Sequence, residues 1–253
     1  MDPHWLTGNA LAGLKRWADA IKSYTRAIEL KDTPFPGANV SFEGWVISYH
    51  LATYHYNRGN AHAARGQYEK AIEDYTATLT LAEKVSAESP GDHHFEVTLG
   101  QHARFNRATT RYMNQDFALT FDDFSECQDV DGERSNTCLG MGNARLMQGR
   151  FGEAHDHYAR GADLDPGRQA QHCKDNLAAV ESLIAITGSA VDDNHRHVEY
   201  PNLVVLQAGD TKEPFPFARS RGNSGNWGWG DGYKGLQGFN VQLRPGNIPT
   251  PSP

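Results

Sequence analysis

Residues 59–75, GNAHAARGQYEKAIEDY, carry the feature that most constrains how this chain can fold. Two small residues, Gly59 and Ala71, stand where two successive helices would have to cross closely. The aromatic rings of Tyr68 and Tyr75 would fill the volume beside that crossing. A single helical hairpin of this kind cannot bury its own apolar face, so stable chains stack several copies of it. The pattern therefore predicts that the unit recurs along the sequence.

Three further copies of the pattern are present, and each shows small and aromatic positions at matching distances. They are centred on the small residues Gly8, Ala108 and Gly142. Their defining residues are Gly8, Trp17, Ala20, Tyr24 and Ala27 in the first copy; Ala108, Phe117, Thr120, Phe124 and Cys127 in the third; and Gly142, Gly149, Phe151, Ala154, Tyr158, Leu164 and Pro166 in the fourth. Recurrence of several features together predicts stacked helical hairpins.

On these residues the chain resembles the tetratricopeptide repeat (TPR) family, whose unit of about 34 residues is a helix–turn–helix. The resemblance covers residues 2–188 and implies an all-α fold, a right-handed superhelix of TPR helical hairpins (an α-solenoid). It places the repeats and the capping helix at about 2–31, 44–85, 93–134, 135–168 and 168–187. Gly, Pro and aromatic residues dominate 189–253, which predicts an irregular tail, extended or disordered.

The spacing between copies departs from the family pattern at two inserts. One insert is residues 32–43, and the other turns near Ser89-Pro90-Gly91. The inserts are either decoration or a partner surface, and the sequence leaves both interpretations open. The third copy also has Thr120 where a small Ala is usual and Gln115 where Gly usually turns, so its helices are expected to pack less closely.

The resemblance also implies where a partner would bind, because the first helices of successive TPR hairpins line a concave groove. Carried over onto this sequence, the groove is lined by Trp5, Asn9, Tyr56, Asn57, Asn60, His102, Phe105, Asn106, Tyr112 and Asn143. An Asn side chain offers a carbonyl acceptor and amide donors, as a peptide backbone does. A row of such side chains can hold an extended peptide whatever its own side chains, with the aromatic residues supplying apolar pockets. The alternative interpretation is that these asparagines only brace adjacent helices.

Some relatives use this groove to clamp the C-terminal carboxylate of heat-shock chaperones with two asparagines and three cations. The two asparagines are present here as Asn9 and Asn57, but Trp5, His102 and Asn106 replace the cations. Capture of a buried carboxylate depends on charge-assisted hydrogen bonds. We therefore predict that this chain is not a chaperone carboxylate clamp.

The tail carries more aromatic residues than a passive solvated segment usually does. Those predicted to dock on a TPR surface, either of the same chain or of a neighbouring copy, are Phe215, Phe217, Trp227, Trp229 and Tyr233. A free tail is the alternative. One short run, residues 202–206, has the composition of a strand.

Composition argues against several classes of protein. A net charge of -7 disfavours unspecific binding to nucleic acid or to anionic membranes. The sequence contains no apolar run of about 18 residues, so no membrane span is expected. No signal-like segment is visible at the start of the sequence, and a cytoplasmic location is expected. Three scattered cysteines form neither a disulfide framework nor a zinc signature.

Candidate catalytic and metal motifs are weak. His155 and His157 lie two residues apart, so on a helix they do not share a face and cannot readily chelate one ion. Cys127 and Cys138 fall on inward-facing repeat positions and are interpreted as small hydrophobic residues. No catalytic residue, metal or cofactor is expected.

Two functions follow from these observations. The first is a non-catalytic protein–protein interaction scaffold, or adaptor, whose concave groove binds an extended peptide segment of a protein partner. The second is a structural subunit of a homo- or hetero-oligomeric assembly in which the aromatic tail docks on a TPR surface.

Overall fold

A computed structural model describes residues 2–30, 44–88, 96–164, 167–187, 205–208 and 240–243. The side chains of residues 96–97 and 182–187 and of both strands are outside this description. The described helices fall into two compact units, which are taken one at a time below. Unit 1 contains the described residues up to Asn114, and unit 2 contains those from Gln115 onward.

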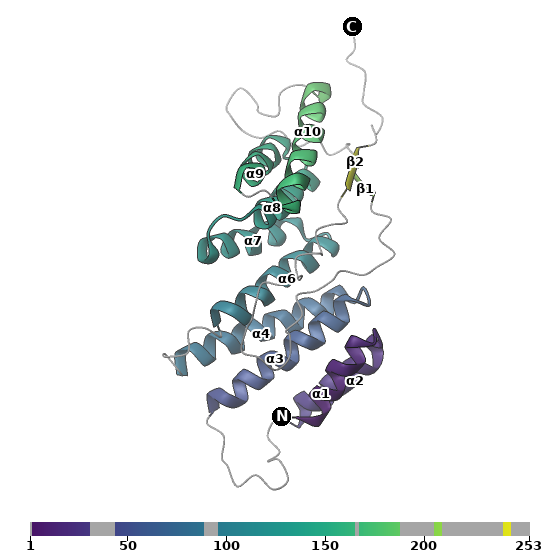
Figure 1. Cartoon of the computed structure of the whole chain (residues 1–253), viewed down its shortest axis with the longest axis vertical. Helices are drawn as coiled ribbons and strands as arrows, with labels where there is room; N and C mark the ends of the chain where they lie inside the picture. The colour runs from purple at the N-terminus through teal and green to yellow at the C-terminus, as the bar shows by residue number, and fades with distance from the viewer. Residues whose placement is uncertain are drawn as a thin grey trace. The chain divides into compact units, whose positions relative to one another are not determined.

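Unit 1 is built from helices that each pack on their neighbour in sequence (Figure 1). They are α1 (Pro3–Gly13), α2 (Trp17–Glu29), α3 (Gly44–Ala63), α4 (Tyr68–Glu88), the π-helical turn η1 (Glu96–Gly100) and α6 (Gln101–Met113). The first helices of successive hairpins also touch: α1 contacts α3, and α3 contacts α6. Contacts between successive hairpins of this kind are typical of an α-solenoid.

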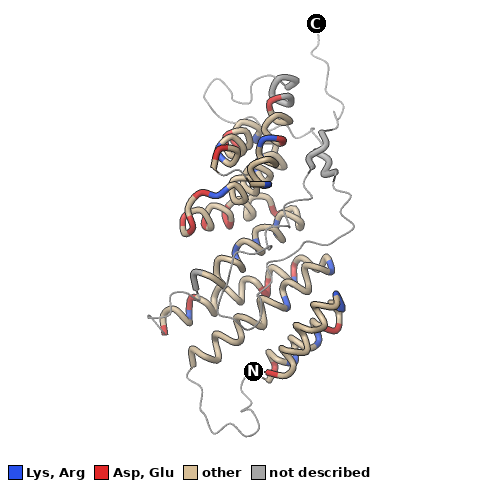
Figure 2. The backbone as a smooth tube through the Cα atoms, viewed as in Figure 1, with Lys and Arg blue, Asp and Glu red and all other residues tan. Residues whose placement is uncertain are grey.

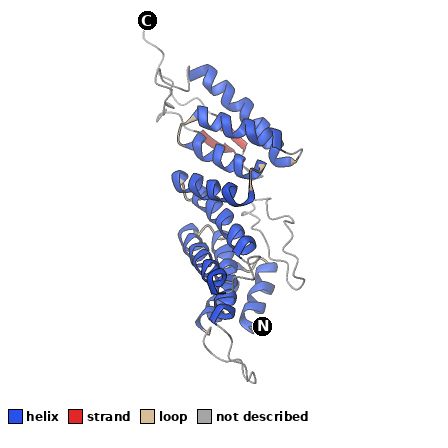
Figure 3. Cartoon of the chain, turned by 90° about the vertical axis from the view of Figure 1, so that its left-hand side faces the viewer, coloured by secondary structure: helices blue, strands red, loops and turns tan. Residues whose placement is uncertain are grey.

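Unit 2 repeats the arrangement. It contains α7 (Phe117–Asp131), α8 (Ser135–Met147), α9 (Phe151–Leu164) and α10 (Arg168–Thr187). Consecutive helices again pack together, and α8 also contacts α10. Two short antiparallel strands, β1 (Val205–Ala208) and β2 (Asn240–Leu243), complete the described part of this unit. Figure 3 shows the helices in blue and these strands in red.

The predicted all-α solenoid is therefore confirmed for the helical part of the chain. The tail, predicted to be irregular, differs in one respect, because β1 and β2 pair with Val205 opposite Leu243 and Ala208 opposite Asn240. The strand-like run predicted at 202–206 overlaps β1 at its last two positions only. A backbone pairing of residues more than thirty positions apart leaves no local signal in the sequence.

The helices begin and end for identifiable reasons. The Asp2 carboxylate caps α1 by accepting from the backbone N–H of His4 at 2.7 Å and of Trp5 at 3.3 Å, and Pro3 occupies the first helical position. The turns inside the hairpins use a left-handed residue, which is Gly66 at φ 71° and Gly149 at φ 75°.

The first and third copies make the same turn without glycine. Lys15 has φ 59° and Gln115 has φ 65°. This conformation places Cβ close to the following carbonyl oxygen and costs roughly 1–2 kcal/mol. The sequence pattern had marked Gln115 as a departure from the family, and the structure shows that the turn keeps its shape despite it.

Close helix crossing depends on the glycines that the sequence pattern singled out. A Cβ on Gly59 would lie 2.9 Å from Tyr75 Cε1, and a Cβ on Gly142 would lie 2.5 Å from Tyr158 Cε1. Both tyrosine rings are fully buried. Ala71, the partner predicted for Gly59, is also fully buried, so the crossing forms as the pattern predicted.

Figure 2 marks the charged residues along the backbone. Helix α7 carries only acidic ones, Asp122, Asp123, Glu126, Asp129 and Asp131, whereas α6 carries only Arg. Asp123 is buried, whereas Asp122, Glu126 and Asp129 are exposed. No helix in the described segments is both long enough and apolar enough to cross a membrane.

Candidate functional site

Within each unit, hydrogen bonds join the predicted groove asparagines to neighbouring helices. In each case, the side-chain oxygen of one Asn accepts two hydrogen bonds. One comes from a tyrosine hydroxyl of the same hairpin, and the other comes from an Asn on the helix that begins the next hairpin or, in unit 2, on α10. We call these bonds the amide ladder and define its rungs by the accepting residues Asn9, Asn60 and Asn143. Each rung pairs residues fifteen positions apart within a hairpin.

The first rung lies between α1, α2 and α3. Asn9 Oδ1 accepts from the Tyr24 hydroxyl at 2.8 Å and from Asn57 Nδ2 at 3.3 Å. Asn9 is half-buried and Asn57 is buried. Both bonds end on the Asn9 oxygen, so its amide nitrogen stays outside them.

The second rung lies between α3, α4 and α6. Asn60 Oδ1 accepts from the Tyr75 hydroxyl at 2.8 Å and from Asn106 Nδ2 at 3.0 Å. Asn106 Nδ2 also donates to the Tyr56 hydroxyl at 3.1 Å, and the Asn60 amide lies beside that hydroxyl as well. Burial raises the pKa of the Tyr56 phenol, so it stays protonated and can serve as donor or acceptor.

The third rung belongs to unit 2. Asn143 Oδ1 accepts from the Tyr158 hydroxyl at 2.7 Å and from Asn176 Nδ2, on α10, at 3.1 Å. Asn143 is 1% exposed and Tyr158 is fully buried. Of the predicted groove residues, the structure therefore joins Asn9 with Asn57, joins Asn60 with Asn106 and Tyr56, and places Asn143 in a separate unit.

The third sequence copy lacks this rung because both partners have changed. Thr109 stands in place of the accepting Asn, and Phe124, fifteen residues later, has no hydroxyl. Thr109 Oγ1 instead donates to the Phe105 carbonyl oxygen at 3.0 Å. The Phe124 ring packs in unit 2 against Gly140, where a Cβ would lie 2.4 Å from Phe124 Cε2.

The aromatic residues predicted to form apolar pockets are mostly buried. Tyr56 is 1% exposed, Tyr112 is 6% exposed and Phe105 is 9% exposed. Trp5 is half-buried, and its ring lies tilted against that of Tyr54, with 6.1 Å between ring centroids. Their contacts contribute to the core, and their use as pockets for a ligand stays a prediction.

His102 occupies a cation position of the family's carboxylate clamp. Burial lowers the pKa of its imidazole to about 4, so the side chain is neutral near pH 7. A neutral imidazole supplies no charge to a bound carboxylate. That the chain is not a carboxylate clamp stays a prediction.

The residues predicted for tail docking, Phe215, Phe217, Trp227, Trp229 and Tyr233, all lie outside the described residues. The first insert, residues 32–43, and the turn of the second insert, at Ser89-Pro90-Gly91, are also outside them. The part of the tail that is described is the strand pair, and β2 contacts α10 within unit 2.

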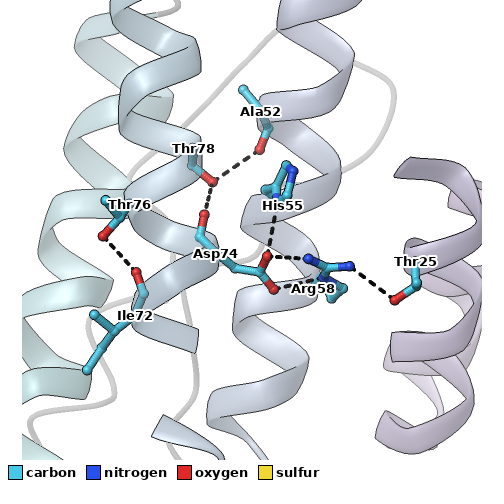
Figure 4. Close-up of polar contacts among 8 residues, drawn as sticks. All are labelled: Thr25, Ala52, His55, Arg58, Ile72, Asp74, Thr76 and Thr78. Atoms are coloured by element: carbon cyan, nitrogen blue, oxygen red, sulfur yellow. Dashed lines mark hydrogen bonds and ion pairs between the residues drawn. The ribbon is translucent and has the colours of Figure 1, made fainter. Parts of the chain in front are cut away.

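A buried ion cluster was missed by sequence reasoning. Asp74, on α4, is 3% exposed, and its carboxylate accepts from Arg58 Nη2 at 2.7 Å and from Arg58 Nε at 2.9 Å. His55 Nδ1 lies 2.8 Å from Asp74 Oδ1, and Arg58 Nη1 donates to Thr25 Oγ1 at 3.2 Å (Figure 4). We call these four residues the Asp74 cluster; it links α2, α3 and α4.

Burial by itself raises the pKa of the Asp74 carboxyl, but hydrogen bonds from His55 and Arg58 and the Arg58 charge outweigh it and leave the pKa below its usual value. The signal available in the sequence was the spacing of His55 and Arg58, which places both on one face of a helix. The other part of the signal was the carboxylate of Asp74, which stands beside the inward-facing Tyr75 in the sequence.

Unit 2 contains a second charged assembly, around Phe121. Arg145 lies over the Phe121 ring, with Cζ 3.5 Å from the centroid, and its Nε is 2.9 Å from Glu153 Oε2. His157 meets the edge of the same ring and accepts at Nδ1 from Arg160 Nη2 at 2.7 Å. Burial, followed by the charges of Arg160 and Arg145, lowers the pKa of His157 to about 4.

Within the described residues, no group of three or more His, Cys, Asp and Glu side chains is placed to hold a metal ion. The cysteines Cys127, Cys138 and Cys173 are free and buried. Burial raises the pKa of the Cys138 thiol, which disfavours the reactive thiolate. The described part of the chain thus offers hydrogen-bonding amides and packed aromatic rings.

The family model described as tetratricopeptide repeat matches residues 52–84, which lie within α3 and α4. None of the curated proteins matches the chain. The matched segment contains the Gly59–Tyr75 crossing and the accepting Asn60 of the second rung.

Proposed function

We propose that this chain, whose residues 52–84 match the tetratricopeptide repeat model, is a non-catalytic protein–protein interaction scaffold whose groove holds an extended peptide segment of a partner. The observation that carries this proposal is the orientation of the first rung. Tyr24 and Asn57 both donate to the Asn9 oxygen, so the amide that Asn9 has left to offer is its nitrogen. An amide N–H pairs with a backbone carbonyl, which every peptide presents regardless of sequence.

The proposal is consistent with the chemistry of the other predicted groove residues. Asn60 is half-buried like Asn9, and its oxygen is engaged in the same way. His102 is neutral near pH 7 and Trp5 is apolar, so the groove offers a peptide carboxylate no cation at these positions. The partner class that fits is therefore an internal, extended segment rather than a free C-terminus.

The test uses the full-length chain and a decapeptide selected against it from a displayed random library. Asn9→Asp keeps the oxygen that accepts from Tyr24 and Asn57 but replaces the amide nitrogen by a second oxygen. Loss of one well-made hydrogen bond should weaken decapeptide binding about tenfold, as measured by fluorescence anisotropy.

Thr7→Asp is the matched control, because it adds the same charge at an exposed position of the same helix. Its affinity should stay close to that of the unaltered chain. If Asn9→Asp and Thr7→Asp bind the decapeptide equally well, the amide groove is not the binding site.

A second candidate function, a structural subunit of a homo- or hetero-oligomeric assembly, is favoured by a different observation. The strand β2 comes from the tail and contacts α10 of the helical domain. Tail segments that reach a helix of their own chain are able to reach the same helix of a neighbouring copy, as in domain swapping. Mass measurement, described in the Discussion, separates the two candidates.

A further inference from the structure

Helix α1 has an exposed face that carries no charged side chain. The exposed residues recur every three or four positions, so they form one stripe along the helix and its C-cap. We call them the α1 stripe: Pro3, Leu6, Thr7, Ala10, Gly13 and Leu14. Leu6 is 46% exposed and Leu14 is 70% exposed. The one hydroxyl of the stripe is already bonded, because Thr7 Oγ1 donates to the Pro3 carbonyl oxygen at 2.8 Å.

The same face of the repeat is buried one hairpin later. Asn9 and Asn60 are equivalent residues of the amide ladder, so Ala10 and Ala61, which follow them, are equivalent too. Ala61 is fully buried and packs in a cluster with Ala20 of α2. Helix faces that stay in contact with water are normally polar, and an exposed apolar one marks an interaction surface. The α1 stripe is therefore a face that suits a second helix.

The stripe is complementary to itself. Ala10 stands at its centre, with Leu6 four residues before it and Leu14 four residues after it. If two copies of α1 run antiparallel about a two-fold axis at Ala10, each Leu6 lies against the Leu14 of the other copy. The two Ala10 side chains meet at the axis, and their small size lets the helices approach closely.

The charges at the ends of α1 favour the antiparallel direction. The Asp2 carboxylate caps the N-terminal end, and Lys15 and Arg16, both exposed, follow the C-terminal end. Antiparallel pairing brings the Asp2 end of each helix beside the Lys15 and Arg16 end of the other, and it opposes the two helix dipoles. A parallel pair would place like charges together at both ends.

We propose that two copies of this chain associate through the α1 stripe, with their α1 helices antiparallel. One face of an 11-residue helix is smaller than the roughly 800 Å² per partner that a stable interface buries. The association is therefore weak, with a dissociation constant on the order of 0.1–1 mM, and the chain is a monomer at micromolar concentration. This surface uses neither the amide ladder nor the tail, so the inference goes beyond the proposed function and is independent of it.

Sedimentation equilibrium of the full-length chain, from about 10 μM to about 500 μM, tests the proposal. The average mass should rise above that of the monomer, 28.0 kDa, as the concentration increases. Leu14→Lys should abolish the rise, because each dimer would hold two ammonium groups against leucine. Leu164→Lys is the matched control: it adds the same charge at the last position of α9, which is 41% exposed, and should leave the rise unchanged.

A mixture of two variants tests the antiparallel direction. Leu6→Glu alone should also abolish the rise in mass. An equimolar mixture of Leu6→Glu and Leu14→Lys should associate again, because an antiparallel pair sets the new carboxylate against the new ammonium and keeps one pair of leucines. An acidic residue in the first turn and a basic one at the C-terminal end both suit the helix dipole, so each variant should fold, as circular dichroism can confirm.

Several outcomes would overturn the proposal. They are a mass that stays at 28.0 kDa at every concentration, a rise that Leu14→Lys leaves intact, and a mixture that fails to associate although both variants are folded. A rise that Trp229→Ala abolishes and Leu14→Lys does not would assign the association to the tail instead. The affinity for the selected decapeptide, measured at micromolar protein, should not change in Leu14→Lys. Failure of peptide binding and failure of this surface are therefore separate results.

Discussion

At the scale of single residues, the groove positions serve the fold before they serve a ligand. Asn57 donates an amide N–H to Asn9 of the neighbouring hairpin at 3.3 Å, and Asn106 donates one to Asn60 at 3.0 Å. The hydroxyl of Tyr24, on another helix, donates to Asn9 Oδ1 and so determines which atom of the Asn9 amide stays available. These asparagines can therefore bind a partner only through amide atoms that the hydrogen bonds between helices do not use.

Asp74 is expected to be the most sensitive single residue of unit 1. Asp74→Asn removes the negative charge from between Arg58 and His55, and should lower the free energy of unfolding by about 3 kcal/mol, because it leaves a largely buried cation without its partner. Urea denaturation followed by circular dichroism measures the change. Asp19→Asn, which breaks an exposed pair with Arg16, should have little effect.

The same carboxylate predicts a direction with pH. Since the folded pKa of Asp74 is lowered, its contribution to stability is present above its unfolded pKa of 3.8 and is lost as pH falls through the lower folded value. Below pH 4 the unaltered chain should therefore lose stability faster than Asp74→Asn. Parallel curves for the two proteins in that range would contradict the assignment of this cluster.

His157 should make unit 2 sensitive to mildly acidic pH. Its pKa is lowered from 6.5 to about 4, so the unfolded chain takes up a proton below pH 6.5 while the folded chain does not. Between pH 7 and pH 5 this group should reduce the free energy of unfolding by about 2 kcal/mol. Stability measured against pH should be flatter in His157→Gln. The more exposed His155 is the control, and an equally flat profile in His155→Gln would contradict the prediction.

At the scale of elements, glycine sets how closely the helices of a hairpin approach. Gly142 faces the Tyr158 ring at a distance that admits no methyl group, and Gly59 faces Tyr75 in the same way. The hydroxyls of these two rings in turn reach Asn143 and Asn60. Close crossing and the amide ladder are thus one arrangement.

Gly142→Ala is expected to destabilise the chain by about 1–3 kcal/mol, because the new Cβ would overlap a ring that is buried and hydrogen-bonded and cannot move aside. Gly13→Ala is the matched control. That position, at the end of α1, has no atom within 4 Å of the added Cβ, and the substitution should stabilise the helix by up to about 1 kcal/mol. Thermal unfolding measures both, and equal effects in the two variants would argue against the close crossing.

At the scale of the whole molecule, the open question is whether the tail acts within its own chain or between chains. If the chain is a scaffold, light scattering should give the mass of a monomer for both proteins: 28.0 kDa for the full-length chain, and the smaller mass of the shortened monomer after removal of residues 189–253. An oligomer that dissociates on removal of the tail would instead support the structural-subunit function. A decapeptide that binds only after the removal would show that the tail occupies the groove.

Much of this protein could be read from its sequence, because the recurring small and aromatic residues are close together in the chain. Gly59, Ala71 and Tyr75 predict a hairpin within seventeen residues, and the helices form as that spacing requires. Departures such as Gln115 and Thr120 were visible for the same reason. Local sterics and helix periodicity are properties of short segments, so a single sequence carries them.

Only the tertiary structure determined which hydrogen-bond partner each of these polar side chains has. Asn143 meets a donor thirty-three residues away, Asn60 one forty-six residues away and Asn9 one forty-eight residues away. The sequence marked these residues as a row of amides, open to a peptide or to bracing. In the fold, their oxygens accept hydrogen bonds that brace neighbouring helices. The donors that remain for a partner are set by these hydrogen bonds between helices, which no local sequence pattern encodes.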